Sequence, residues 1–94
     1  MTRYTVHFTG RVQGVGFRYA TTRLARDYSV AGYVQNLADG RVRLVVEGRK
    51  DELDSFVESV QERMARNIRN THIDEQAATG EFGDPTPGNV QVKH

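Results

Sequence analysis

The residues with the clearest potential for chemistry are three glycines and an arginine between positions 10 and 18. This segment reads GRVQGVGFR, and Gly10, Gly14 and Gly16 allow positive φ angles that other residues avoid. A loop of this kind before a helix directs unpaired backbone N–H groups toward one point, where the helix dipole also favours negative charge. The guanidinium of Arg18 adds a bidentate donor that suits a phosphoryl group. The segment therefore predicts a phosphate-binding loop.

A purely structural interpretation of the same loop stays open. Glycines are common where a strand turns into a helix, and Arg18 would then be a solvated surface residue. Neither common nucleotide motif fits the loop. It lacks the Gly-Lys-Ser/Thr ending of a P-loop, and the residue that would complete a dinucleotide fingerprint after Gly14 and Gly16 is Tyr19. ATP and NAD are therefore not expected as ligands.

A second polar residue of interest, Asn36, lies just before an Asp39-Gly40 turn signal within GYVQNLADGRVRLVVEG. Its amide can donate and accept hydrogen bonds without titrating, which would allow it to orient a small polar molecule. Asn and Asp-Gly are also favoured near hairpin turns for local backbone reasons. At this point both explanations of Asn36 stand.

Hydrophobic periodicity predicts the elements that must position these residues. Alternation of apolar residues indicates strands, and apolar spacings of three and four indicate amphipathic helices. The predicted elements are a strand around 4–8, a helix over 17–28, strands over 30–37 and 42–46, a helix over 53–64, a strand over 68–77 and a short strand over 90–92. This βαββαβ order most simply gives an α+β, ferredoxin-like sandwich, a mainly antiparallel sheet with both helices packed on one face.

The two segments GRVQGVGFR and GYVQNLADGRVRLVVEG resemble the two signature motifs of the acylphosphatase family, in the order and spacing of that family. The resemblance covers roughly residues 3–65 and implies the same ferredoxin-like fold. It also implies hydrolysis of the carboxyl-phosphate bond of small acyl phosphates to a carboxylate and inorganic phosphate. By the same resemblance, Arg18 and the loop amides hold the phosphoryl group and Asn36 orients the attacking water. The implied phosphate-binding residues are Arg11, Val12, Gln13, Gly14, Val15, Gly16, Phe17 and Arg18.

Length, charge and composition limit the other possibilities. With 94 residues the chain is expected to form a single domain over 1–94, and its formal charge of +1 builds in no attraction to nucleic acid or to an anionic membrane. No cysteine is present, and the three histidines lack metal-ligand spacing, so neither a metal nor a cofactor is expected. No segment is long and apolar enough for a signal or a membrane span. The expected protein is a cytoplasmic monomer whose partners are an acyl phosphate substrate and inorganic phosphate, the product and an inhibitor.

The C-terminal third departs from the family pattern. It ends in Asn89-Val-Gln-Val-Lys-His94 after a predicted loop over 80–89, where family members usually finish with a strand of large apolar residues.

Two alternatives to the enzyme remain open. One is a non-catalytic module that binds phosphate or carbamoyl phosphate, as in larger carbamoyl-transfer maturation proteins, and the other is a structural protein that retains the loop. The chain lacks the extra domains and cysteine pairs of those larger proteins, which favours the free enzyme.

Overall fold

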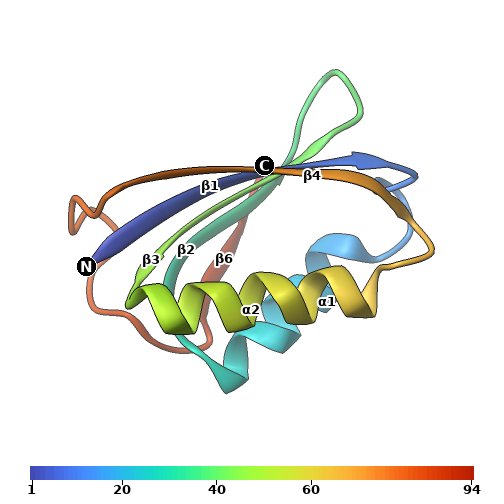
Figure 1. Ribbon diagram of the computed structural model, residues 1–94. Helices are drawn as coiled ribbons and strands as arrows, with labels where there is room; N and C mark the ends of the chain where they lie inside the picture. The colour runs from blue at the N-terminus through green and yellow to red at the C-terminus, as the bar shows by residue number, and fades with distance from the viewer.

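A six-stranded sheet with both helices on one face forms the molecule. The computed structural model describes residues 1–94 (Figure 1). The elements in chain order are β1 (Thr2–Gly10), α1 (Phe17–Leu24), the short 3₁₀ helix η1 (Ala25–Asp27), β2 (Ser29–Asn36), β3 (Val42–Gly48), α2 (Lys50–Arg63), β4 (Ile68–Ala77), β5 (Thr86–Pro87) and β6 (Asn89–Lys93). The predicted α+β, ferredoxin-like arrangement is confirmed.

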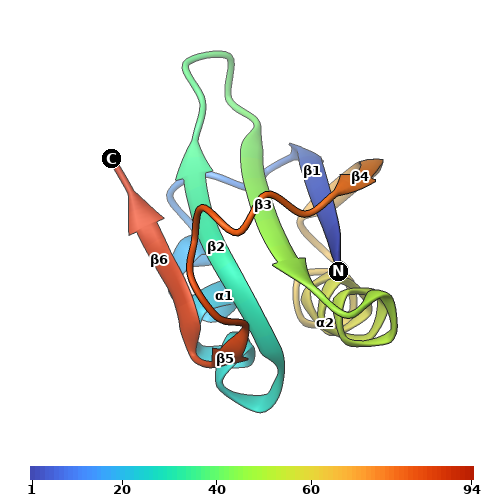
Figure 2. The same cartoon turned by 90° about the vertical axis from the view of Figure 1, so that its left-hand side faces the viewer.

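The sheet is mainly antiparallel, as predicted. Its strand order is β4-β1-β3-β2-β5, and β6 also pairs with β2. The contacts of β1 with β3, of β1 with β4 and of β2 with β3 are antiparallel, whereas β6 runs parallel to β2. Figure 2 shows β6 beside β2 at one edge and β4 beyond β1 at the other. Figure 1 shows both helices below the strands, on the same side of the sheet, so the opposite face carries no helix.

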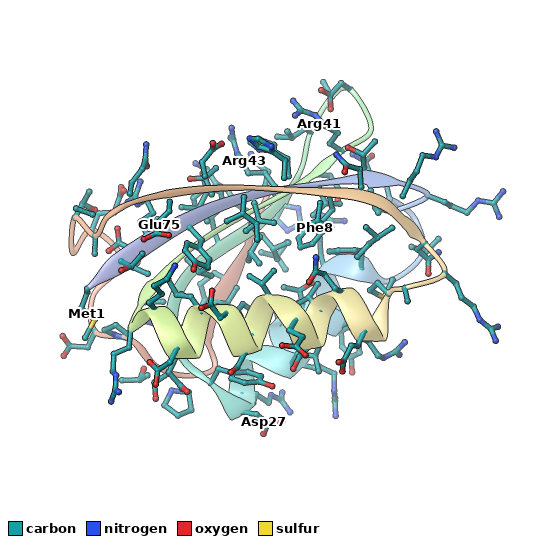
Figure 3. All side chains as sticks on the ribbon, viewed as in Figure 1. Met1, Phe8, Asp27, Arg41, Arg43 and Glu75 are labelled. Atoms are coloured by element: carbon teal, nitrogen blue, oxygen red, sulfur yellow. The ribbon has the colours of Figure 1, made fainter.

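The core lies between the sheet and the helices, and alternation in the strands builds it. Val6 and Phe8 of β1 are fully buried, and Figure 3 shows Phe8 on the helix side of the sheet and Arg43 on the other side. From α2, Leu53, Phe56 and Val60 supply the facing surface with no exposed area. Each large apolar side chain buried in this way contributes about 1.5–3 kcal/mol to folding. The sheet and the helices are therefore held together mainly by these side chains.

Several predicted boundaries differ from the structure. Strands β1 and β3 extend beyond the predicted 4–8 and 42–46, and α2 covers Lys50–Arg63 where the pattern predicts 53–64. The helix predicted over 17–28 ends at Leu24 and continues as η1, because Tyr28 takes an extended conformation with φ −133° and ψ 144°. Its side chain still packs against the core, which explains why its spacing fits the helix pattern. The strand predicted over 30–37 begins and ends one residue earlier, at Ser29 and Asn36.

The C-terminal third forms more regular structure than its weak pattern suggests. Strand β4 has the predicted bounds and pairs with β1 from end to end. The predicted loop over 80–89 contains the two-residue strand β5, and β6 extends the predicted strand 90–92 by one residue at each end. β4 is an edge strand and most of its side chains are exposed, so it makes few apolar contacts. Its backbone pairing with β1 compensates for this.

A buried carboxylate fastens the segment that connects the two edges of the sheet. Glu47 of β3 is only 2% exposed, although it lies on the face without helices. It accepts hydrogen bonds from the backbone N–H groups of Thr79 at 2.8 Å and Gly80 at 2.9 Å, and from Nε of Arg3 at 2.8 Å. Figure 2 shows the segment between β4 and β5 passing across the front of β3. Burial alone would raise the pKa of Glu47, but these donors outweigh it and hold the pKa below its usual value.

Replacing Glu47 with Gln should lower the free energy of unfolding at neutral pH by about 1–3 kcal/mol, because the new NH₂ group would face donors it cannot pair with. In the wild-type protein the free energy of unfolding should fall as the pH drops below the ordinary Glu pKa of 4.5. In this range the unfolded chain binds more protons at this position than the folded protein does. Urea unfolding at several pH values measures both effects.

The matched control is Glu58→Gln, on the exposed side of α2. This variant should keep the wild-type stability and the wild-type slope at acid pH. An acid slope in Glu47→Gln as steep as that of the wild type would contradict the role assigned to the Glu47 carboxylate.

Candidate functional site

The loop between β1 and α1 leaves its backbone donors free. Gly14 and Gly16 have φ angles of 74° and 80°, and Gly16 is the N-cap of α1 without any side-chain cap. No backbone N–H group from residue 12 to residue 16 donates to another backbone group. The first N–H groups of α1 also lack acceptors within the helix, because its N-terminal bonds begin with Ala20 N–H to Gly16 O. A row of free donors therefore lies where the positive end of the helix dipole adds to them.

Buried side chains hold both ends of this loop. Val12 is 1% exposed and Phe17 is 2% exposed, and the Phe17 ring packs on Phe8 with ring centroids 5.0 Å apart. The backbone N–H of Arg11 donates to the carbonyl of Asn67 at 2.9 Å. Gly14 and Gly16, between these anchors, would have no atom within 4 Å of an added Cβ. The loop is thus fixed at its ends and open at its glycines.

Arg18 and Asn36 line one cavity of about 340 Å³. Arg18 comes from the first turn of α1, and Asn36 is the last residue of β2. The Arg18 side chain makes no hydrogen bond or ion pair within the protein, and no Asp or Glu lines the cavity. The Oδ1 atom of Asn36 is buried and has no hydrogen-bond partner. The structure therefore brings together the two residues that the sequence analysis singled out, both without internal partners.

Not every residue of the predicted phosphate-binding set lines this cavity. Those that do are Val12, Gly14, Gly16, Phe17 and Arg18, and those that do not are Arg11, Gln13 and Val15. Val15 borders a neighbouring groove between the two helices instead. The Gln13 side chain turns toward the β2–β3 hairpin, where its Nε2 donates to the carbonyls of Leu37 at 2.7 Å and Arg41 at 2.9 Å.

The cavity also contains residues that the sequence analysis missed: Tyr19, Thr22, Val92 and His94. Helical spacing could have indicated Thr22, because it lies four residues after Arg18. Val92 reaches the cavity because β6 pairs in parallel with β2, placing Val92 beside Val34. Nothing in a short strand pattern identifies its partner strand, so Val92 and His94 could not have been found in this way.

The other titratable groups lie elsewhere. His7 pairs across the strands with His72 and does not line the cavity; burial and then the charges of Arg41 and Arg43 lower its pKa. No group of three or more His, Asp or Glu side chains is arranged to hold a metal ion. No helix has the length and apolar character needed to cross a membrane.

This arrangement suits a tetrahedral anion with a water molecule beside it. Free backbone N–H groups and an unpaired guanidinium can surround the anion from one side. The Oδ1 atom of Asn36 is buried and has no hydrogen-bond partner within the protein. It can therefore accept a hydrogen bond from a water molecule. The site has the parts to bind an anion and to orient a water molecule.

The chain is similar in sequence to known acylphosphatases. The family model described as Acylphosphatase matches residues 4–85. The chain is 46% identical over 82 residues to the acylphosphatase of Salinibacter ruber, covering 85% of each protein, and 45% identical over 83 residues to that of Paenarthrobacter aurescens, covering 87% of this chain and 88% of the relative.

Solved structures agree with these sequence relatives. The crystal structure of acylphosphatase from Bacillus subtilis superimposes with a TM-score of 0.83 at 30% identity, covering all of both chains. The structure of HypF from T. kodakarensis also matches, with a TM-score of 0.78 at 31% identity. This match covers all of the present chain and only 12% of HypF.

Asn36→Ala should leave the free energy of unfolding within about 0.5 kcal/mol of the wild type, because the side chain makes no internal hydrogen bond and its buried oxygen is unpaired. The neighbouring variant Gln35→Ala is the control. It should cost about 1 kcal/mol, since Oε1 of Gln35 accepts a hydrogen bond from Arg43 at 3.0 Å. Urea unfolding of the two variants measures this difference, and a larger loss in Asn36→Ala would show that Asn36 has a structural role.

Proposed function

The chain belongs to the acylphosphatase family, and from this premise we propose that it hydrolyses small acyl phosphates to a carboxylate and inorganic phosphate at the cavity shared by Arg18 and Asn36. In this proposal residues 1–94 act as one catalytic domain and as a monomer. The observation that carries it is that Arg18 and Asn36 line one cavity while both lack internal partners.

The phosphoryl group binds in the loop between β1 and α1. The free N–H groups over residues 12–16 donate to its oxygens, and the helix dipole favours its negative charge. Arg18 adds a charge-assisted contact from the first turn of α1, and its planar guanidinium can engage two phosphoryl oxygens at once. No carboxylate in the cavity competes with the phosphate for these donors.

Asn36 orients the attacking water. Its Oδ1 accepts a hydrogen bond from the water, which directs an oxygen lone pair toward phosphorus. Water adds to phosphorus as the bond between phosphorus and the acyl oxygen breaks, so the products are the carboxylate and inorganic phosphate. The proton released by the water ends on phosphate or solvent.

The leaving group explains why so few groups are needed. A carboxylate is stable as an anion, so the reaction requires no strong general acid. Phosphoryl transfer is catalysed mainly by positioning and by stabilising charge on the phosphoryl oxygens. The loop amides and Arg18 supply that positive field, so we expect activity to survive treatment with a chelator.

The match to 12% of HypF shows that a domain similar to this chain also occurs as part of a larger protein. This observation keeps a second candidate open, a non-catalytic module that binds phosphate or carbamoyl phosphate. Incubation with a small aryl acyl phosphate in the presence of a chelator separates the two, as loss of the acyl-phosphate absorbance reports hydrolysis. An enzyme consumes the substrate and is inhibited competitively by inorganic phosphate, its product. A binding module binds phosphate and leaves the acyl phosphate intact.

Arg18→Ala should lower kcat/KM by roughly 10³-fold or more, because it removes a contact to the phosphoryl charge in both the bound substrate and the transition state. Arg18→Lys should remain badly impaired, since it keeps the charge but loses the planar pair of donors. Steady-state kinetics measures both variants. Arg26→Ala, which removes an exposed arginine from η1 at the other end of the helical segment, should behave as wild type. Near wild-type activity in Arg18→Lys would reduce the role of Arg18 to general electrostatics.

Asn36→Ala should remove more than nine-tenths of turnover while inorganic phosphate still binds, because the loop and Arg18 are unchanged. Asn36→Asp should lose turnover and also bind phosphate more weakly, as it places an anion beside the phosphoryl group. Turnover and the phosphate inhibition constant are measured separately in both variants. If Asn36→Ala keeps more than about a tenth of the wild-type rate, a loss under about 1.4 kcal/mol, the role assigned to Asn36 is wrong.

A further inference from the structure

One side chain joins the two halves of the site. The Nε2 of Gln13 donates to Leu37 O at 2.7 Å and to Arg41 O at 2.9 Å, so both protons of its amide are used. Leu37 directly follows Asn36 in the chain, and Arg41 directly precedes β3. The side chain therefore spans from the phosphate-binding loop to the hairpin that carries Asn36.

These two hydrogen bonds are the only ones that residues 12–15 make with the rest of the protein. Apart from them, the burial of Val12 is what restrains this part of the loop. The free N–H groups that suit a phosphate are thus on a segment that has almost no polar restraint of its own. The side chain of Gln13 supplies that restraint by binding to the β2–β3 hairpin, which lies outside the loop.

The hairpin end of this connection is rigid. The N–H of Leu37 donates to Arg41 O at 2.8 Å, and the N–H of Gly40 donates to Leu37 O at 3.2 Å. The side chain of Asp39 also accepts from the N–H of Arg41 at 3.1 Å. Gln13 therefore binds to carbonyls whose positions the turn already fixes, and through them to the end of β2.

We propose that Gln13 is a positioning residue that sets the distance between the phosphate-binding loop and Asn36. This inference rests on the proposed function, in which phosphorus and the attacking water must meet between these two elements. A displacement of about 1 Å between reacting groups can cost on the order of 10²-fold in rate. Gln13 touches neither the phosphoryl group nor the water through its side chain, because both amide protons are directed to the hairpin.

The test compares Gln13→Met, which keeps the length of the side chain without its donors, with Gln13→Ala, which removes both. In each variant kcat should fall about 10- to 100-fold, while the inhibition constant for inorganic phosphate should rise less than about 10-fold. A residue that served stability alone would not separate these two quantities at a temperature where the variants remain folded. An unchanged kcat, within about twofold, in the folded variants would overturn the proposal.

The matched control is Asn89→Ala. The Nδ2 of Asn89 also bridges two backbone carbonyls, those of Phe82 at 3.3 Å and Asp84 at 3.0 Å, but these lie outside the site. This variant should lose comparable hydrogen bonds and keep kcat within about twofold of the wild type.

A double-mutant cycle tests whether Gln13 acts through Asn36. In an Asn36→Ala background, Gln13→Met should lower kcat by less than about threefold, because the group that it helps to position is already gone. An equal loss in both backgrounds would overturn the assigned route.

Amide resonances distinguish failure of this proposal from failure of the proposed function. If the wild-type protein does not hydrolyse an acyl phosphate, the proposed function is wrong. The hydrogen-bonded connection between Gln13 and the hairpin is then tested separately in ¹H–¹⁵N spectra. Gln13→Met should shift the resonances of both 12–16 and 37–41, whereas Asn89→Ala should leave both segments unchanged. If Gln13→Met left residues 37–41 unshifted, the connection would be disproved.

Discussion

The fold has to satisfy one requirement above all: the backbone N–H groups of the loop between β1 and α1 must stay without acceptors in the protein. Donors kept free for a ligand contribute nothing to folding, so the segment over residues 12–16 must be held by its surroundings. Val12 and Phe17 anchor it in the core, Arg11 binds the turn after α2, and Gln13 binds the hairpin. The positive φ angles at Gly14 and Gly16 let the chain turn while those donors stay exposed.

The same separation between binding and stability applies to the side chains of the site. Arg18 has no internal partner, and the buried oxygen of Asn36 is unsatisfied. The buried carboxylate of Glu47, by contrast, accepts hydrogen bonds from four donors: Nε of Arg3, the N–H of Gly80, and both the N–H and the hydroxyl of Thr79. Two buried side-chain atoms lack a partner, Oδ1 of Asn36 and Nε of Arg43, and only the first lines the cavity, where a ligand can complete it. An unpaired group of this kind is expected at a site whose function costs some stability.

Local patterns predicted most of the fold because each central strand has one apolar face. Tyr4, Val6 and Phe8 alternate cleanly, and the Asp39-Gly40 signal correctly marked the β2–β3 turn. What local patterns could not predict depends on contacts between distant segments. Glu47 looks solvent-facing in its alternating strand, and only the chain crossing over it makes it a buried anchor. Likewise, the hydrogen bonds of Gln13 reach carbonyls more than twenty residues away, which no spacing rule covers.

The pairing of the sheet has a consequence for the order in which the protein folds. The β2–β3 hairpin is local, whereas β1 meets β4 by pairing Thr2 with Ala77, and β2 meets β6 by pairing Ala31 with Asn89. Distant pairings close large loops and slow folding, so the hairpin should form early and the sheet edges late. The cavity needs α1, the end of β2 and β6 together. In a refolding experiment, recovery of activity should therefore lag behind the first secondary structure and report completion of the whole sheet; recovery that coincides with hairpin formation would contradict this order.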